Sequence, residues 1–153
     1  MEAVIFIGVQ GSGKTTFYKE RLFETHVRVS RDMLKTRNRE GLLIAACLAA
    51  RQPFVVDDTN SVKSQRAGHI AGAKAAGFRV HGYFFRCDLK DALRRNRERP
   101  PDRVVPPAAV AATFKRLEPP SFSEGFDVIR IVQVDAADGF AVEECDRSKG
   151  EQP

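Results

Sequence analysis

Short apolar runs alternate along the chain with longer segments in which apolar residues recur every three or four positions. The runs predict strands buried on both faces of a parallel sheet, and the longer segments predict helices. We expect strands at residues 3–7, 27–30, 54–56, 80–85 and 127–134. We expect helices at residues 14–23, 32–52, 61–77, 89–99 and 108–117. This order predicts an α/β fold, a doubly wound parallel sheet of about five strands with helices on both faces.

Ligands of such folds bind beyond the carboxyl ends of the strands, so the segments that follow the strands are the candidates for a site. Prolines at both ends of residues 100–107 mark a loop between the last two helices, which suits a lid. We expect residues 1–145 to form one domain, because a chain of 153 residues with 42% hydrophobic residues can bury one core. We expect the polar residues 146–153 to form a disordered tail.

Cysteine spacing, the length of the apolar runs and net charge indicate which kinds of protein this chain can be. Cys47, Cys87 and Cys145 are far apart and form no C-x-x-C pair, which indicates neither a disulfide framework nor a zinc site. The first apolar run is too short for a signal peptide, and no later stretch approaches a membrane span. We therefore expect a cytoplasmic protein that does not bind membranes. The formal net charge of +5 suits a polyanionic partner and suits a merely basic surface equally well.

A glycine-rich loop carries the strongest chemical signal. Residues 8–15 match G-x-x-x-x-G-K-[ST] between the first strand and the first helix, where this phosphate-binding motif belongs. Backbone N–H groups and the helix start would hold phosphate oxygens, Lys14 would reach the β- and γ-phosphates, and Thr15 would bind Mg²⁺. The predicted ATP-binding residues are Gly8, Gln10, Gly11, Ser12, Gly13, Lys14, Thr15 and Thr16. The alternative is a glycine turn that only caps a helix.

A carboxylate follows the second predicted strand. No N-K-x-D motif of GTPase switches is present, which leaves a kinase or an ATPase. Asp32 lies just past the strand end, on the crevice side, and is the candidate general base for an acceptor hydroxyl. Its alternative role is to cap the next helix.

Two aspartates end the third predicted strand. One of Asp57 and Asp58 is expected to hold a water on Mg²⁺, and the other faces the acceptor or belongs to the turn. The sequence does not divide these roles. Together with Asp32, Lys35, Thr59 and Asn60, the two aspartates form the predicted acceptor site.

Arginines precede the proline-rich loop. Arg95 and Arg99 lie four residues apart on one predicted helical face, which suits a lid that closes guanidinium groups over the transferring phosphoryl group. The alternative is a solvated basic face. A second basic cluster, Lys35, Arg37 and Arg39, supplies candidate contacts to a nucleic-acid backbone.

With these residues placed, the chain resembles the 5′-hydroxyl polynucleotide kinase family, the P-loop kinase domain of end-healing polynucleotide kinase/phosphatase enzymes. The resemblance covers residues 3–134 and rests on blocks at 8–16, 29–32, 56–60, 95–106 and 114–126. It implies phosphate and Mg²⁺ contacts from Lys14 and Thr15, a base for the ribose 5′-hydroxyl in Asp32, and lid roles for Arg95 and Arg99.

The sequence departs from that family at two points. Phage and bacterial relatives often carry an arginine three residues after the base, where this chain has Lys35, which supplies charge without a bidentate fork. Those enzymes also commonly join the kinase to a phosphatase, ligase or other repair domain. A kinase that stands alone would have separate repair enzymes as partners or a smaller acceptor.

Three functions follow from these residues. The first is transfer of the γ-phosphoryl group from ATP or another NTP to a 5′-hydroxyl end of single-stranded or end-frayed DNA or RNA. The second is a small-molecule kinase for a sugar, nucleoside, nucleotide-sugar or antibiotic, because the same loop, base and lid serve all of these. The third is a non-catalytic nucleotide-binding module that uses ATP to switch partners.

Overall fold

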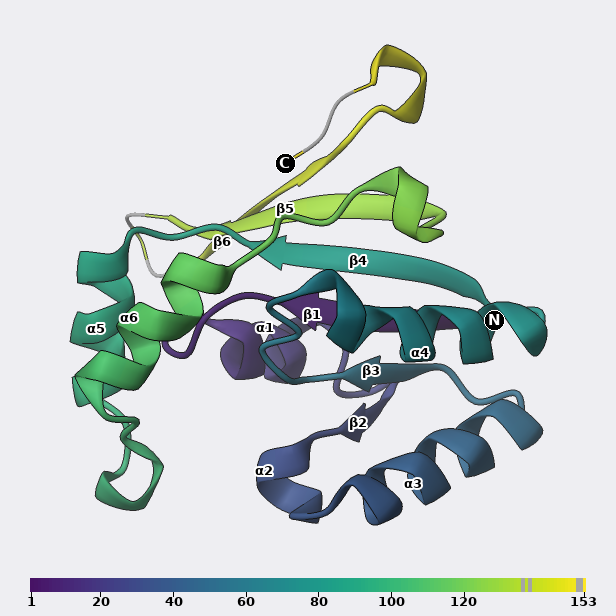
Figure 1. Ribbon diagram of the computed structural model, residues 1–153, viewed down its shortest axis with the longest axis horizontal. Helices are drawn as coiled ribbons and strands as arrows, with labels where there is room; N and C mark the ends of the chain where they lie inside the picture. The colour runs from purple at the N-terminus through teal and green to yellow at the C-terminus, as the bar shows by residue number, and fades with distance from the viewer. Residues whose placement is uncertain (136, 138, 151–152) are drawn as a thin grey trace.

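The computed structural model describes residues 1–135, 137, 139–150 and 153. In this part of the chain, six strands form one sheet in the order β2-β3-β1-β4-β5-β6 (Figure 1). They are β1 (Glu2–Ile7), β2 (Val27–Val29), β3 (Phe54–Val56), β4 (Arg79–Phe85), β5 (Val128–Val134) and β6 (Phe140–Glu144). The first five strands run parallel, and β6 pairs antiparallel with β5. The predicted doubly wound α/β fold is confirmed.

Helices cover both faces of the sheet. They are α1 (Lys14–Arg21), α2 (Arg31–Leu34), α3 (Arg37–Ala49), α4 (Lys63–Ala75), α5 (Leu89–Arg97) and α6 (Pro107–Arg116). The 3₁₀ segments are η1 (Pro101–Arg103), η2 (Phe122–Glu124) and η3 (Arg147–Lys149). Figure 1 shows α5 and α6 together beyond the carboxyl end of β4, apart from the helices that lie along the sheet.

Side chains of β1 alternate between two cores, as expected for a central strand. Val4 and Phe6 pack with Phe17 of α1 on one face. Ile5 and Ile7 pack on the other face with residues of α3 and α4. The loop after β1 therefore leads to a helix on one face, and the loop after β3 leads to α4 on the opposite face. The two loops separate at a topological switch point, where open α/β sheets bind their ligands.

Two elements differ from the sequence prediction. The helix expected over residues 32–52 is divided into α2 and α3, because Lys35 adopts φ 69° and Thr36 starts a new helix by accepting a hydrogen bond from the N–H of Arg39. The strand β6 was not predicted, because its residues are mostly exposed and form no apolar run of the kind that marks the buried strands.

The end of the chain has local structure. The segment predicted as a disordered tail contains η3, whose first N–H groups are capped by Asp146. Residues 151 and 152 of that tail lie outside the described residues. The domain boundary at residue 145 stays a prediction. Across the described part of the chain, no helix has the length and apolar character needed to cross a membrane.

Candidate functional site

Glycines shape the loop between β1 and α1 where a side chain has no room. Gly11 has φ 78°, and a Cβ built there would lie 2.3 Å from the carbonyl oxygen of Ala92 in α5. Gly13 has φ 100°, and a Cβ there would lie 3.2 Å from the Phe140 ring and 3.3 Å from Val134. The loop is therefore held closely between α5 on one side and β5 with β6 on the other.

Lys14 folds back over this loop. Its Nζ donates hydrogen bonds to the carbonyl oxygens of Gly8 at 2.8 Å and Val9 at 2.7 Å. Burial lowers the pKa of Lys14 from 10.5 to about 8, and the nearby carboxylates of Asp57 and Asp58 oppose that fall. A partly buried ammonium group of this kind gains more from an anionic partner than an exposed lysine would.

Two polar side-chain atoms in the loop have unused hydrogen-bonding capacity. The Oγ of Ser12 and the Oε1 of Gln10 are buried, and neither has a hydrogen-bond partner among the described residues. Buried polar atoms are normally satisfied, so such a pair beside a dehydrated lysine points to a polar ligand in the loop. Thr16, the last of the predicted loop residues, is exposed at the start of α1.

Thr15, Asp57 and Arg28 form a contiguous cluster. The Thr15 hydroxyl donates to Oδ2 of Asp57 at 3.1 Å. Arg28 of β2 donates from Nε to the same Oδ2 at 2.7 Å and from Nη2 to the Thr15 hydroxyl at 3.3 Å. The structure thus brings together the predicted metal ligands Thr15 and Asp57, and adds an arginine that sequence reasoning did not identify.

Asp57 and Asp58 contact different parts of the site. Asp57 lies two residues after Val55, which packs in the core beneath α1, and its carboxylate faces the phosphate loop. Asp58 follows Val56 of the opposite core and lies 3.9 Å from the Arg31 guanidinium. Burial raises the pKa of Asp58, while a hydrogen bond from the Thr59 N–H and the charge of Arg31 oppose that rise.

Arg31 is held by a buried acid. Its Nη2 and Nε donate to Oε2 of Glu40 at 2.8 Å and 3.3 Å. Glu40 is only 4% exposed, and its Oε1 is buried without a partner among the described residues, as is the Oγ of Ser30. Asp32 is exposed on α2, near enough to Asp58 for its charge to contribute to the raised pKa of Asp58. Sequence reasoning did not identify Glu40.

The predicted basic cluster lies at the rim of this side. Lys35 is exposed at the end of α2, and Arg37 and Arg39 are exposed in the first turn of α3. Arg39 also donates to the carbonyl oxygen of Leu34 at 3.3 Å. The cluster is thus next to Asp32 in the chain and open to solvent.

The predicted lid arginines lie over the loop. Arg95 donates to the carbonyl oxygen of Gly11 at 3.5 Å, and the charge of Arg99 helps to lower the pKa of Lys14. Asn96, which is fully buried, donates to the carbonyl oxygen of Val105 at 2.7 Å and accepts from its N–H at 3.0 Å. This pair of hydrogen bonds closes the base of the proline-rich loop.

Comparison with known families agrees with this arrangement. The sequence profile of the AAA domain family matches residues 4–120, which include the phosphate loop, both aspartates and the predicted lid arginines. The chain belongs to the AAA domain family.

Solved structures of low sequence identity share the fold of this AAA domain. A gluconokinase from Sinorhizobium meliloti 1021 has TM-score 0.59 and 18% identity, over 87% of this chain and 82% of its own. Kti12 from Chaetomium thermophilum, in complex with ADP-AlF3, has TM-score 0.61 and 19% identity, over 89% and 92%. A chain of the PezAT toxin-antitoxin system of Streptococcus pneumoniae has TM-score 0.65 and 13% identity, over 98% and 72%. The AAA domain therefore has the fold of a P-loop kinase-like nucleotide-binding domain.

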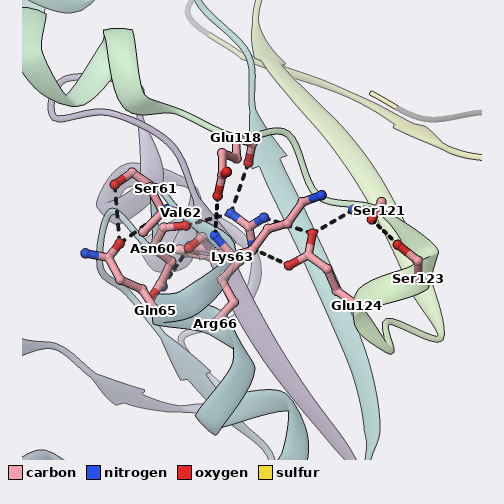
Figure 2. Close-up of polar contacts among 11 residues, drawn as sticks. Asn60, Ser61, Val62, Lys63, Gln65, Arg66, Glu118, Ser121, Ser123 and Glu124 are labelled. Atoms are coloured by element: carbon pink, nitrogen blue, oxygen red, sulfur yellow. Dashed lines mark hydrogen bonds and ion pairs between the residues drawn. The ribbon is translucent and has the colours of Figure 1, made fainter.

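Figure 2 shows a network of polar contacts centred on Arg66, beside the loop that follows β3 of the AAA domain. Arg66 is fully buried and donates to both oxygens of Glu124, at 2.7 Å and 2.8 Å. Its Nη1 donates to the carbonyl oxygens of Asn60 at 2.9 Å and Glu118 at 3.0 Å. The loop after β3 is thereby tied to the segment after α6. Sequence reasoning did not identify Arg66, because its partners Glu118 and Glu124 are more than 50 residues away.

Two predicted acceptor residues fix the loop to the sheet. The side-chain amide of Asn60 donates to the carbonyl oxygen of Phe6 at 2.8 Å, and Asn60 is 5% exposed. The carbonyl oxygen of Thr59 accepts a hydrogen bond from the N–H of Gly8 at 3.0 Å. These bonds join the loop after β3 to β1 and to the start of the phosphate loop.

The side chains present fit Mg²⁺ bound together with a nucleotide. The described residues contain no group of three or more His, Cys, Asp or Glu that could hold a metal ion by itself. Mg²⁺ is usually bound by one or two protein oxygens and by substrate phosphates, and the Thr15 hydroxyl with the Asp57 carboxylate supplies such oxygens. The Ser12 hydroxyl in the adjoining loop, which has no partner in the part of the chain that the structure describes, fits phosphate in the same place.

Proposed function

We propose that this AAA domain is a kinase that transfers the γ-phosphoryl group of ATP to a hydroxyl acceptor. The observation that carries the proposal is the division of the site between two adjacent aspartates. Asp57 contacts the phosphate-loop residue Thr15, whereas Asp58 lies on the side of Arg31 and Asp32. A domain that only binds nucleotide does not need acidic side chains on the side of the sheet edge away from the phosphate loop.

The phosphate side would bind and orient the donor. Lys14 would exchange its two carbonyl partners for β- and γ-phosphate oxygens, and Thr15 and Asp57 would hold Mg²⁺. Bound Mg²⁺ would neutralise charge on the β- and γ-phosphates. Arg95 and Arg99 would stabilise charge on the transferring oxygens, and the lid would exclude water from the reaction.

The acceptor side would remove the proton of the acceptor hydroxyl. The acceptor oxygen forms a bond to the γ-phosphorus, the bond from that phosphorus to the β–γ bridging oxygen breaks, and ADP leaves. The carboxylate of Asp32 would take the proton of the acceptor hydroxyl, a step that typically contributes about 10² to 10⁴ in rate. Asp58, Lys35 and the loop held by Thr59 and Asn60 would position that hydroxyl.

The favoured acceptor is a 5′-hydroxyl end of DNA or RNA. Lys35, Arg37 and Arg39 are exposed beside Asp32, where they could contact the backbone of a strand whose end lies at the base. A cavity of about 340 Å³ opens next to Val9 of the phosphate loop, and the exposed ring of Phe114 in its lining could stack on a nucleobase. The resemblance to polynucleotide kinases supports the same acceptor.

A small polyol is the second candidate. On the acceptor side, Glu40 and Ser30 each have a buried oxygen with no partner among the described residues, and such groups recognise hydroxyls. A gluconokinase is among the proteins of similar fold. The two acceptors differ in charge, because a strand contacted through several phosphates binds more weakly as salt increases, whereas a neutral polyol does not.

The deciding experiment is label transfer from γ-labelled ATP with Mg²⁺ to a 5′-hydroxyl oligonucleotide, with the 5′-phosphorylated oligonucleotide and the Lys14→Ala variant as controls. Label on the hydroxyl end alone would support the polynucleotide reaction. For that acceptor, Lys35→Ala should raise KM at low salt, and Lys19→Ala, in the last turn of α1, should not. Label on sugars alone would select the second candidate, and ATP binding without transfer to either would indicate a nucleotide-binding module.

A further inference from the structure

Arg28 reaches the site from the edge strand β2. It pairs in register with Val55 of β3, so its side chain lies on the same face of the sheet as Val55 and Asp57. The guanidinium carbon of Arg28 is 5.9 Å from the centre of the Tyr18 ring, and this cation–π contact helps to hold the arginine side chain in place. The Arg28 side chain is 26% exposed and that of Asp57 is 2% exposed, so solvent competes little for the carboxylate.

The hydrogen bonds of Arg28 use the oxygens that a metal ion would need. A hydroxyl has one hydrogen and two lone pairs. The Thr15 hydrogen is directed to Asp57 at 3.1 Å, and Arg28 donates to the same Thr15 oxygen at 3.3 Å. Arg28 also donates to Oδ2 of Asp57 at 2.7 Å. A single guanidinium therefore contacts both protein groups that fit Mg²⁺.

The positive charge of Arg28 opposes metal binding, as its hydrogen bonds do. Arginine stays protonated throughout the working pH range, so a permanent positive charge lies within hydrogen-bond distance of both groups. Two cations at such a separation repel strongly in a partly dehydrated site. Arg31, which lies beside Asp58, is bound to Glu40 and does not take the place of Arg28.

We infer that Arg28 is a positioning residue that competes with the divalent cation for Asp57 and Thr15, so that metal binds firmly only with the nucleotide. This inference rests on the proposed function. Arg28 keeps the two side chains together before the nucleotide arrives, and it withholds their oxygens from free metal. The phosphates supply the additional oxygens that allow the metal to displace Arg28 from Thr15.

Binding of Mn²⁺, measured by the electron paramagnetic resonance signal of the free ion, tests this inference without any turnover. Arg28→Gln should bind Mn²⁺ in the absence of nucleotide at least about tenfold more tightly than the wild type, because a competing charge is removed. With ADP present, the two proteins should differ less. Arg28→Lys, which keeps the charge but cannot bridge both groups, should give an intermediate affinity.

The matched control is Arg130→Gln. Arg130 also lies over a tyrosine ring, at 5.3 Å from the centre of Tyr83, and pairs with Glu144 at 2.9 Å, but it lies on β5, away from the metal ligands. Its removal should leave Mn²⁺ affinity unchanged. Equal or weaker Mn²⁺ binding by Arg28→Gln would overturn the inference and make Arg28 a simple support for Asp57.

Failure of the inference can be told from failure of the proposed function. If wild-type protein takes up Mn²⁺ with ADP but Arg28→Gln has no effect, only the inference is wrong. If wild-type protein takes up no Mn²⁺ even with ADP, the kinase proposal fails and the inference fails with it. Should Arg28→Gln not fold, Arg28→Lys carries the test, and an affinity no higher than that of the wild type would overturn the inference.

Discussion

Asp57 and Asp58 are consecutive in the chain, but the first accepts a hydrogen bond from Thr15 and the second lies near Arg31. The alternation of side chains along β3 produces this separation, because one aspartate follows the core beneath α1 and the other follows the opposite core. In the proposed transfer, Asp57 would therefore serve the nucleotide and Asp58 the acceptor.

Replacing Asp57 or Asp58 with asparagine should affect different properties, Mg²⁺ dependence in the first variant and acceptor KM in the second. We expect Asp57→Asn to weaken Mg²⁺-dependent activity by about 10- to 100-fold, with the loss partly recovered at high Mg²⁺. We expect Asp58→Asn to raise KM for the acceptor and to leave the Mg²⁺ dependence unchanged. Steady-state kinetics over a range of Mg²⁺ and acceptor concentrations measures both effects. The same Mg²⁺ dependence in both variants would contradict this division of roles.

Gly11 should tolerate no side chain. Gly11→Ala places a Cβ 2.3 Å from the Ala92 carbonyl oxygen and forces alanine into φ 78°. We expect the free energy of unfolding to fall by about 1–3 kcal/mol and nucleotide affinity to fall with it, because α5 must move away from the loop. The matched control is Gly72→Ala in α4, where nothing lies within 4 Å of the new Cβ. Helix propensity should make that variant more stable, by up to about 1 kcal/mol.

Urea unfolding and calorimetric titration with ATP measure these two quantities. A Gly11→Ala protein with normal stability and normal nucleotide affinity would show that the contact between α5 and the loop is not needed.

Nucleotide affinity should depend on pH through Lys14. The pKa of Lys14 in the free protein is lowered to about 8, and bound phosphates favour the protonated form and so raise it. Affinity should therefore be constant below pH 8 and should fall above it, by up to about tenfold per pH unit, as binding requires proton uptake. Titrations with a fluorescent ATP analogue from pH 7 to pH 9.5 measure this. Lys14→Ala should bind weakly at every pH, and a wild-type affinity without a break near pH 8 would contradict the expectation.

The Arg66–Glu124 pair should be essential for stability. Glu124→Gln leaves a fully buried guanidinium without its bidentate carboxylate, and the expected loss is about 3–5 kcal/mol in the free energy of unfolding. The exposed pair of Arg94 and Glu98 is the control, and Glu98→Gln should change stability by less than about 1 kcal/mol. Urea denaturation of both variants provides the comparison. Similar small losses at the two sites would mean that the network in Figure 2 contributes little.

Contiguous signals were predictable from sequence, and contacts across the sheet were not. The phosphate-loop motif occupies eight consecutive residues, 8–15, and the buried strands are marked by apolar runs. The break at Lys35 depends on a single left-handed residue, which sequence periodicity does not reveal. Arg28 and Asp57 are 29 positions apart, so their contact depends on β2 lying next to β3. That strand order is a property of the whole fold.

The hydrogen-bonded pair of Asn96 and Val105 has a consequence for how this domain can diversify. Because the pair joins the end of α5 to the segment before α6, residues 100–104 form a short loop whose ends stay anchored. The entropy of closing a loop grows only slowly, by about 0.6 kcal/mol for each doubling of its length. Inserts of other lengths and charges can therefore be exchanged at this point while α5 keeps its place on the phosphate loop.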